Sequence, residues 1–380
     1  MRSNVKTDME KHIVNTRRII CYAKLTHLFI GLKNQKLNVC DARRWKRAFF
    51  HFLCNVKEQN CDYAYRWNIV EGFAKSNIEI IKKIQNTKNS QKEYVPVLIS
   101  VILNERERIE VFLKHYRKIG IQKFALLDNG STDGTVEFLK QQADVELFQT
   151  KDKFESRIKM GWINRIISYY GTANWYLVVD ADEFIVWQGV ERYGIQSIVK
   201  CFHKRGVNRA RALMVDMYVK ESEKEALKTF EEIYPKCRYF DSDTYYHKKA
   251  EEVYLLCGGP RNRKLDIEVW LTKYPLFKLK ECEILSNPHT IYPYKNKWTP
   301  CFFAILHYKF LTRNDQIKMR KYAEKGNYAG GSAEYKLYLK KQKENMGNMD
   351  FYYDGSVEYQ SSQSLSNIRE IDKIPIRHLK

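Results

Sequence analysis

Long apolar runs are missing from this 380-residue sequence: none approaches the roughly eighteen residues that a membrane-spanning helix needs. The first residues, MRSNVKTDMEKH, also lack the apolar stretch of a secretory signal. These two absences predict a cytoplasmic protein.

Closely spaced cysteines are missing as well. The nine cysteines are odd in number and widely scattered, and none forms a C-x-x-C pair. This argues against a disulfide framework and against a structural zinc site, so we expect reduced thiols. A content of 44% hydrophobic and 14% aromatic residues excludes a disordered or fibrous chain.

Acidic residues are few relative to basic ones. Sixty-six Lys and Arg against 45 Asp and Glu give a net charge of +21. We therefore expect an anionic partner: nucleic acid, an acidic membrane surface or a phosphorylated small molecule. Residues 1–93 hold 19 basic and 8 acidic side chains, a local charge of +11.

The range 1–93 has no Pro and two Gly, and it carries basic amphipathic segments such as residues 17–32. Apolar residues recur there at helical spacing. We predict a basic helical annex. Two interpretations stay open for it: helices packed on a neighbouring domain, or a contact with a membrane surface through Lys and Arg.

From Tyr94 onward, apolar runs alternate with helical patterns, which predicts βαβ units and a mostly parallel sheet flanked by helices. We assign residues 94–310 to this α/β domain and 311–380 to a helical C-terminal tail. The predicted strands are 95–103, 123–128, 145–150, 175–180 and 299–310, and the predicted helices are 107–119, 135–142, 154–170 and 314–325.

Polar residues follow the predicted strands at the sheet edge where ligands bind. Asn104 and Glu105 follow the first strand, and Asp180 and Asp182 follow the fourth. Two carboxylates that project to the same side repel each other unless a cation lies between them. The pattern predicts Mg²⁺ or Mn²⁺, completed by substrate phosphate. The alternative is that both acids are solvated and cap the following turn.

Three segments together carry a family resemblance: VLISVILNE at 97–105, LLDNGSTDGT at 126–135 and VVDADEF at 178–184. Over residues 94–310 the chain resembles the family 2 nucleotide-sugar glycosyltransferases of the Rossmann-like GT-A fold, and their family 92-like relatives. The resemblance implies that Asp128 contacts the nucleotide base. It also implies that Asp180 and Asp182 hold a metal on the diphosphate, with His307 as a third ligand. The alternatives are a capped strand-to-helix turn at 129–134 and a core histidine at 307.

Residues 258–263, GGPRNR, combine a flexible turn with two guanidinium groups. Arg261 is therefore a candidate for binding the donor diphosphate or the acceptor, against the alternative of an ordinary turn. Lys273 and Lys309 are weaker candidates for pairing with phosphate.

The catalytic base is less well defined. In the family, this acid commonly belongs to a Glu-Asp pair after the glycine-containing loop, and the pair is missing here. Asp266 is the nearest substitute, with Asp241, Asp243 and Glu268 as alternatives. The departure leaves open whether the stereochemistry is inverting, as the resemblance would suggest.

The resemblance implies a metal-dependent enzyme that transfers a sugar from a UDP- or GDP-sugar to a hydroxyl of a glycan or lipid-linked acceptor, in polysaccharide biosynthesis. We expect it in the cytoplasm, with peripheral contact at the inner face of an anionic membrane, and without a nucleic-acid partner. Two rivals remain. One is a catalytically degenerate GT-A scaffold, and the other is a basic nucleic-acid-binding protein, which the net charge favours and the acidic strand ends oppose.

Overall fold

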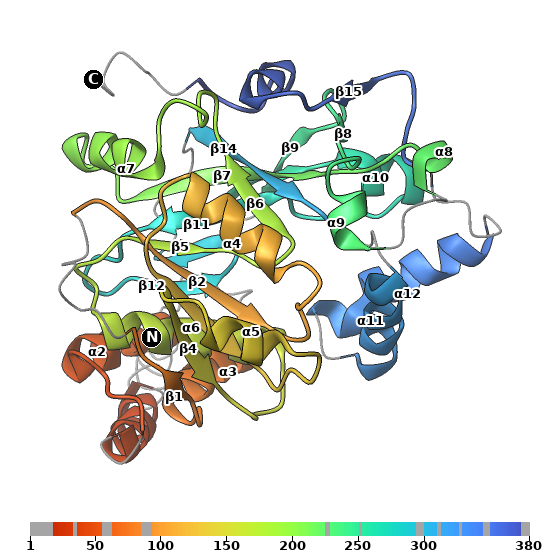
Figure 1. Ribbon diagram of the computed structural model, residues 1–380. Helices are drawn as coiled ribbons and strands as arrows, with labels where there is room; N and C mark the ends of the chain where they lie inside the picture. The colour runs from red at the N-terminus through yellow and green to blue at the C-terminus, as the bar shows by residue number, and fades with distance from the viewer. Residues whose placement is uncertain are drawn as a thin grey trace, which may run out of the picture.

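The computed structural model describes residues 18–32, 36–54, 63–84, 93–224, 229–250, 253–293, 300–309, 313–326, 329–344 and 350–373. These residues form a Rossmann-like α/β fold, in which a large mixed sheet has helices on both faces (Figure 1). The predicted fold class, an α/β protein with a mostly parallel sheet flanked by helices, is confirmed.

The elements have the following bounds. The helices are residues 18–31, α2 (Ala42–Cys54), α3 (Tyr63–Ala74), α4 (Ile109–Lys118), α5 (Thr135–Lys140), α6 (Ser156–Tyr170), α7 (Ile195–Lys204), α8 (Glu221–Lys224), α9 (Phe230–Ile233), α10 (Gly259–Leu265), α11 (Arg313–Lys325) and α12 (Ala329–Glu344), with a 3₁₀ helix at Ser362–Asn367. The strands are β1 (Glu79–Lys82), β2 (Val97–Ile102), β3 (Phe124–Asp128), β4 (Val145–Gln149), β5 (Tyr176–Val178), β6 (Glu183–Val186), β7 (Arg209–Asp216), β8 (Tyr239–Asp241), β9 (Tyr246–Ala250), β10 (Val253–Cys257), β11 (Thr272–Phe277), β12 (Ile284–Asn287), β13 (Thr290–Tyr292), β14 (Cys301–His307) and β15 (Ser356–Glu358).

The main sheet has nine strands in the order β1-β4-β3-β2-β5-β11-β7-β14-β6. Parallel pairing joins β4, β3, β2 and β5, and it also joins β7 to β14. Strand β11 is antiparallel to both β5 and β7, so these two groups run in the same direction. The edge strands β1 and β6 are antiparallel to their neighbours. The carboxyl ends of six strands therefore lie at one edge of the sheet.

Successive residues of the central strands pack into different cores. Leu98 and Leu126 pack with α4, α5 and α7 on one face, whereas Ile99 and Leu127 pack with α2, α3 and α6 on the other. Side chains along a strand alternate between the two faces, so a strand covered on both sides needs an unbroken apolar run. For this reason the sequence predicts the positions of these strands.

The predicted elements between residues 94 and 180 all occur, each within a few residues of its predicted bounds. Beyond Phe184 the sequence allowed fewer predictions, and the structure adds β6, β7 and β11 to the same sheet. Strand β7 reads RARALMVD, and both of its arginines are buried. A buried strand that contains charged residues does not form an apolar run, so its sequence does not predict it.

The described part of the predicted annex packs closely on the α/β domain. Helices α3 and α6 cross at Gly72 and Gly161, and a Cβ at Gly161 would lie 2.4 Å from the Ile69 carbonyl oxygen. Only glycine permits this approach of two backbones. Residues 79–82, which we expected within a helical annex, form β1 and pair with β4.

The C-terminal range contains the predicted helix as α11, followed by α12, and the two pack beside the cavity described below. It is not helical throughout, because β15 pairs with β8. Among the described residues, no helix has the length and apolar character needed to cross a membrane.

Candidate functional site

A cavity of about 650 Å³ lies where the parallel strands β2, β3 and β5 end. Its walls come from the ends of these strands, the segment after β4, the start of α6 and the helices α11 and α12. The lining residues are Val101, Ile102, Leu103, Glu105, Arg108, Asn129, Gly130, Lys151, Asp152, Lys153, Phe154, Lys159, Asp180, Ala181, Asp182, Lys309, Asp315, Lys318, Met319, Tyr322, Lys325 and Tyr335. The cavity lies at the sheet edge where the sequence predicts a ligand-binding site.

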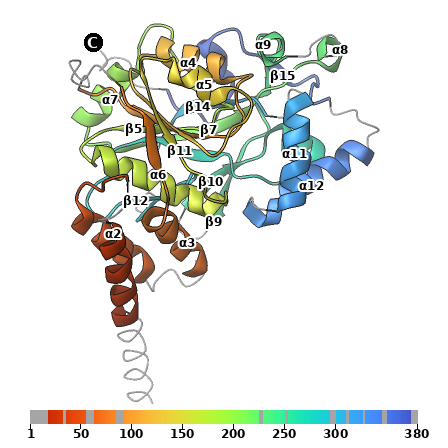
Figure 2. The same cartoon turned by 60° about the horizontal axis from the view of Figure 1, so that its bottom comes forward.

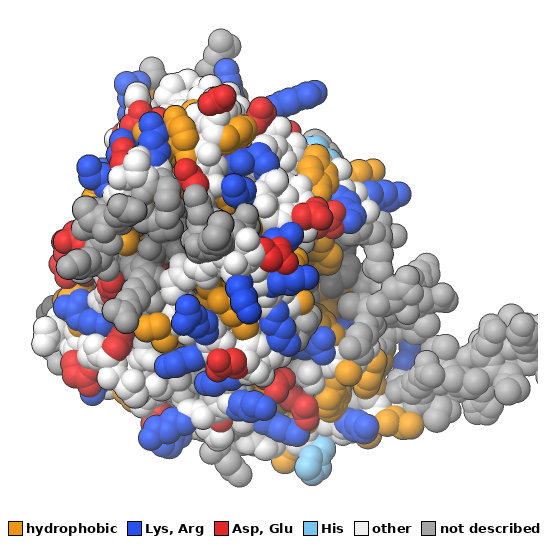
Figure 3. Space-filling view, turned by 90° about the vertical axis from the view of Figure 1, so that its right-hand side faces the viewer, with side chains coloured by type: hydrophobic (Ala, Val, Ile, Leu, Met, Phe, Trp, Pro, Cys, Tyr) orange, Lys and Arg blue, Asp and Glu red, His pale blue; other side chains and the backbone are white. Residues whose placement is uncertain are grey.

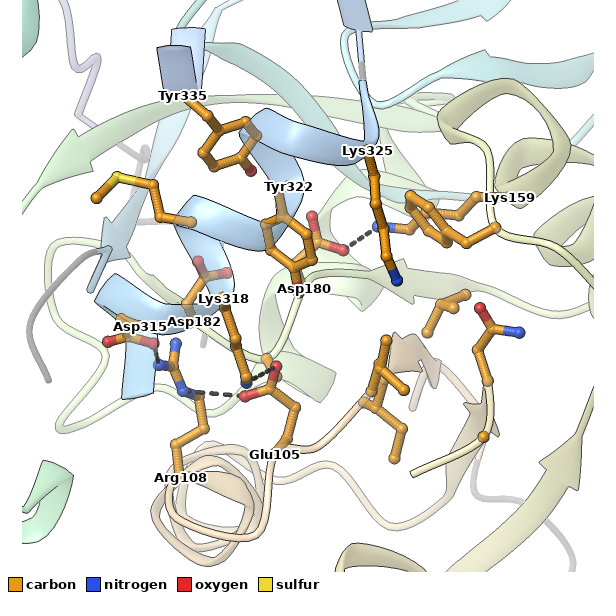
Figure 4. A pocket seen from close by; sticks show the side chains of 18 of the residues that line it. Glu105, Arg108, Lys159, Asp180, Asp182, Asp315, Lys318, Tyr322, Lys325 and Tyr335 are labelled. Atoms are coloured by element: carbon orange, nitrogen blue, oxygen red, sulfur yellow. Dashed lines mark hydrogen bonds and ion pairs between the residues drawn. The ribbon is translucent and has the colours of Figure 1, made fainter. Parts of the chain in front are cut away.

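Asp180 and Asp182 both line the cavity, in a turn between β5 and β6. The turn is closed by the backbone N–H of Glu183, which donates to the Asp180 carbonyl oxygen at 3.1 Å. Asp180 forms an ion pair with Lys159 (Figure 4), and its other carboxylate oxygen lies 3.8 Å from Lys273. The two acids have therefore taken different partners: Asp180 faces lysines, and Asp182 faces His307.

His307 ends β14 and is buried between two carboxylates. Its Nδ1 lies 2.6 Å from Asp216, and its Nε2 lies 3.4 Å from Asp182. Burial by itself would raise the pKa of Asp182, but the charge and hydrogen bond of His307 and the charges of Arg108 and Lys309 hold it well below its usual range. Burial lowers the pKa of His307, and the two carboxylates outweigh that effect and raise it.

One ligand atom from each of Asp182, Glu183 and His307 lies within 4.8 Å of the other two. Two carboxylates and an imidazole form a donor set that suits Mn²⁺ better than Mg²⁺, which prefers oxygen alone. The predicted ligand set was Asp180, Asp182 and His307, and Glu183 was not predicted. Glu183 is buried and bonded to Lys273, so Asp182 and His307 are the better ligands for an ion that also touches substrate.

A network of buried ion pairs and hydrogen bonds holds Asp216, the carboxylate that contacts His307 Nδ1. Arg261 donates to both oxygens of Asp216, at 2.8 and 3.1 Å, and to Glu334 of α12 at 2.7 Å. Lys309 donates to the same Glu334 oxygen at 2.7 Å. Burial would raise the pKa of Glu334, but Lys309 and Arg261 lower it to about 2. Arg261 does not line the cavity and holds Asp216 and Glu334, and its contact with diphosphate or acceptor stays a prediction.

A second ion-pair cluster, beside Asp182, forms another part of the cavity wall. Arg108 pairs with Glu105 at 3.0 Å and with Asp315 of α11, and Lys318 of α11 pairs with Glu105 at 2.9 Å (Figure 4). Burial raises the pKa of Glu105, and Arg108 and Lys318 oppose that effect. Glu105 thus lies at the cavity as predicted, where it attaches α11 to the end of β2.

The loop after β3 is held by its own polar side chains. Asp128 is fully buried and accepts hydrogen bonds from the backbone N–H groups of Gly130 and Ser131 and from Gln149. It does not line the cavity. The structure shows the capped turn that was the alternative, and the contact of Asp128 with a nucleotide base stays a prediction.

Asn104 has a similar structural role. Its backbone is in the left-handed region with φ 54°, which asparagine tolerates better than most residues. Its N–H donates to the Ser131 hydroxyl, and its side-chain oxygen accepts the N–H of Thr132, both at 2.8 Å. Asn104 does not line the cavity but holds the loops after β2 and β3 together.

The predicted base and its alternatives lie elsewhere. Asp266 is exposed at the C-terminal end of α10, Asp241 is buried against Arg263, Asp243 accepts from the Tyr353 hydroxyl, and Glu268 pairs with Lys248. None of the four lines the cavity. The carboxylates that do are Glu105, Asp152, Asp180, Asp182 and Asp315.

Sequence reasoning missed the contribution of the C-terminal helices. Lys318, Tyr322 and Lys325 of α11 and Tyr335 of α12 face the cavity, and Figure 4 shows the Lys325 ammonium group pointing into it. Tyr322 and Tyr335 pack edge to face with ring centroids 5.5 Å apart. The spacing of 318, 322 and 325 was the available signal, because these positions share one face of a helix.

No family model and no curated protein matches this sequence. Among solved structures, the chain is similar to the crystal structure of HddC from Yersinia pseudotuberculosis, with a TM-score of 0.29 and 10% sequence identity, over 59% of this chain and 97% of that one. A likeness of this degree identifies neither a family nor an activity.

Proposed function

We propose that this protein is a metal-dependent GT-A glycosyltransferase, which moves a sugar from a UDP- or GDP-sugar to a hydroxyl of a glycan or lipid-linked acceptor. One observation carries the proposal. Asp182 lines a cavity whose other walls present seven Lys and Arg side chains, and the Nε2 atom of the buried His307 lies 3.4 Å from the Asp182 carboxylate.

This combination suits a metal-bound diphosphate. The basic lining residues are Arg108, Lys151, Lys153, Lys159, Lys309, Lys318 and Lys325, against five lining carboxylates. A simple cation site would not need this many positive charges, and a simple phosphate site would not include Asp182, whose carboxylate faces His307. A divalent ion held by Asp182 and His307 would neutralise charge that grows on a leaving diphosphate.

The surface around the C-terminal helices agrees with an anionic substrate. Figure 3 shows the side of the molecule that lies at the right in Figure 1, where many Lys and Arg side chains are spread among fewer acidic ones. Such a surface attracts an anionic donor over long distances. The apolar part of the cavity, which includes Phe154, Met319, Tyr322 and Tyr335, offers contacts to a base or a sugar ring.

A second candidate function is a binding protein with the same ligand and no turnover. The position of Asp266, Asp241, Asp243 and Glu268 outside the cavity favours it, because none of these carboxylates can reach an acceptor hydroxyl there. The two candidates share a ligand and differ in whether free nucleotide diphosphate is released.

The test is a thermal-stability screen with UDP- and GDP-sugars, with and without Mn²⁺, followed by measurement of nucleotide diphosphate release. We expect stabilisation by one nucleotide class that requires the metal. Asp182→Asn should abolish it and leave the unliganded melting temperature within a few degrees. Asp266→Asn is the matched control and should behave as the parent protein. Stabilisation that survives Asp182→Asn or excess EDTA contradicts the metal assignment, and ligand binding without release selects the second candidate.

A further inference from the structure

The helix at residues 18–31 uses only one face to pack on the protein. Cys21, Leu25 and Leu32 are buried in the core shared with α2 and α3. These residues recur at the spacing of a single helical face. Ile19 and Ile30 are exposed on the opposite side of the helix, and Tyr22 packs edge to face on Phe50 of α2 with ring centroids 5.8 Å apart. Figure 2 shows this helix, in red, extending beyond α2 at the outer end of the molecule.

The exposed part of this helix is apolar. Ile19, Ile20, Tyr22 and Ile30 are 71%, 50%, 54% and 64% exposed. Together with Tyr63 they are five of the nine large hydrophobic side chains that the described part of the chain exposes. Scattered exposed hydrophobic residues are ordinary on protein surfaces, whereas a cluster of them on one helix indicates a contact surface.

Basic side chains surround this apolar face. The described residues between 18 and 54 include seven Lys and Arg and one acid, Asp41, which accepts a hydrogen bond from the backbone N–H of Arg44. Two of the lysines lie over aromatic rings: Lys46 is 4.0 Å from the ring centroid of the exposed Tyr22, and Lys24 is 5.8 Å from that of the partly buried Trp67. Arg44 is buried, and Lys36 and Arg47 are paired with Glu79 and Glu281. The cationic groups beside the aliphatic and aromatic side chains are therefore Arg18, Lys24, Arg43 and Lys46.

We propose that helix 18–31 and the adjoining basic residues of α2 bind the surface of an anionic lipid bilayer. The isoleucines enter the acyl boundary, Tyr22 lies at the headgroup level, and Lys24, Arg43 and Lys46 contact anionic headgroups. Charge complementarity favours this occupant over a second copy of the chain, because two copies would bring their basic surfaces together. The inference is independent of the proposed enzymatic function.

The experiment measures sedimentation of the full chain with vesicles of pure phosphatidylcholine, or with vesicles in which a third of the lipid is phosphatidylglycerol. Ile19→Gln/Ile30→Gln removes apolar groups without changing charge. Lys24→Gln/Arg43→Gln removes charge without changing the apolar face. The matched control is Lys140→Gln/Lys200→Gln, at exposed positions of α5 and α7.

We expect the parent protein to bind the anionic vesicles and to dissociate from them at high salt. Each of the two surface variants should bind at least about tenfold more weakly, and the control should bind as the parent does. All four proteins should keep the same melting temperature. Equal binding to neutral and anionic vesicles, or unchanged binding of both surface variants, overturns the proposal. A parent dimer that becomes a monomer on Ile19→Gln/Ile30→Gln assigns the surface to a second copy and also overturns it.

Discussion

His307 Nδ1 lies 2.6 Å from Asp216, and this contact leaves the Nε2 atom of the same ring directed at Asp182, 3.4 Å away. A histidine that donates its Nδ1–H to a carboxylate presents the Nε2 lone pair to a metal, and the carboxylate fixes the orientation of the ring. Asp216 is itself held by Arg261. The order of contacts thus runs from α12 through Arg261 and Asp216 to the candidate metal ligand.

Asp216→Asn is expected to lower Mn²⁺ affinity by about 10- to 100-fold, the usual effect of losing the carboxylate behind a ligating histidine. Isothermal titration calorimetry with Mn²⁺ alone measures this without substrate. The variant also removes the charge partner of Arg261, so its melting temperature must be recorded in parallel. Asp144→Asn, which removes the partner of Arg117 at the surface, is the control. An unchanged Mn²⁺ affinity would show that Asp216 does not position His307 for a metal.

Asp128→Ala is expected to destabilise the protein and to leave donor binding nearly unchanged. The substitution leaves the N–H groups of Gly130 and Ser131 without their acceptor, at a cost of about 1–3 kcal/mol. Thermal unfolding and the donor KM are measured on the same variant. A raised KM with an unchanged melting temperature would instead return Asp128 to the role of a base contact.

Lys325→Gln is expected to raise the donor KM about fivefold, because it removes one cation from the cavity, worth about 1 kcal/mol. Mn²⁺ affinity should not change. Lys321→Gln is the matched control, since Lys321 is exposed on the same helix and does not line the cavity. The same KM increase in both variants would indicate a general effect of charge.

His115→Gln tests the pH dependence of stability. The partly buried imidazole packs on Phe184 with Nε2 3.0 Å from the Ile185 carbonyl oxygen, and its removal from water lowers the pKa of His115 from 6.5 to about 4. Between these pH values the unfolded chain binds a proton that the folded chain does not, so the free energy of unfolding decreases as the pH falls. The loss is about 3 kcal/mol once the pH is below 4.

Urea unfolding at pH 7, 5.5 and 4.5 measures this dependence. The free energy of unfolding of His115→Gln should depend less on pH over this range than that of the parent protein. His203→Gln, at an exposed position on α7, should keep the dependence of the parent protein. If His115→Gln and the parent protein have the same dependence, other groups account for the acid sensitivity.

The sequence by itself determined the centre of the fold. Strands β2, β3 and β5 are almost entirely apolar because both faces of the sheet are covered, and helix α4 shows a regular apolar face because one side is exposed. These patterns depend only on neighbours along the chain. They were enough to predict the α/β class and to place Asp180 and Asp182 at the ligand-binding edge.

Only the tertiary structure decided how each polar residue is used. Asp128 and Asp182 both stand at the ends of buried strands. Asp128 accepts hydrogen bonds from backbone N–H groups of its own turn, whereas Asp182 faces His307, which belongs to a distant strand. Likewise, α11 and α12 bring Lys318, Lys325 and Tyr335 to the cavity from the far end of the chain. The role of a carboxylate or an ammonium group depends on which charges surround it after folding, and contacts between residues so far apart in the sequence have no local pattern from which to predict them.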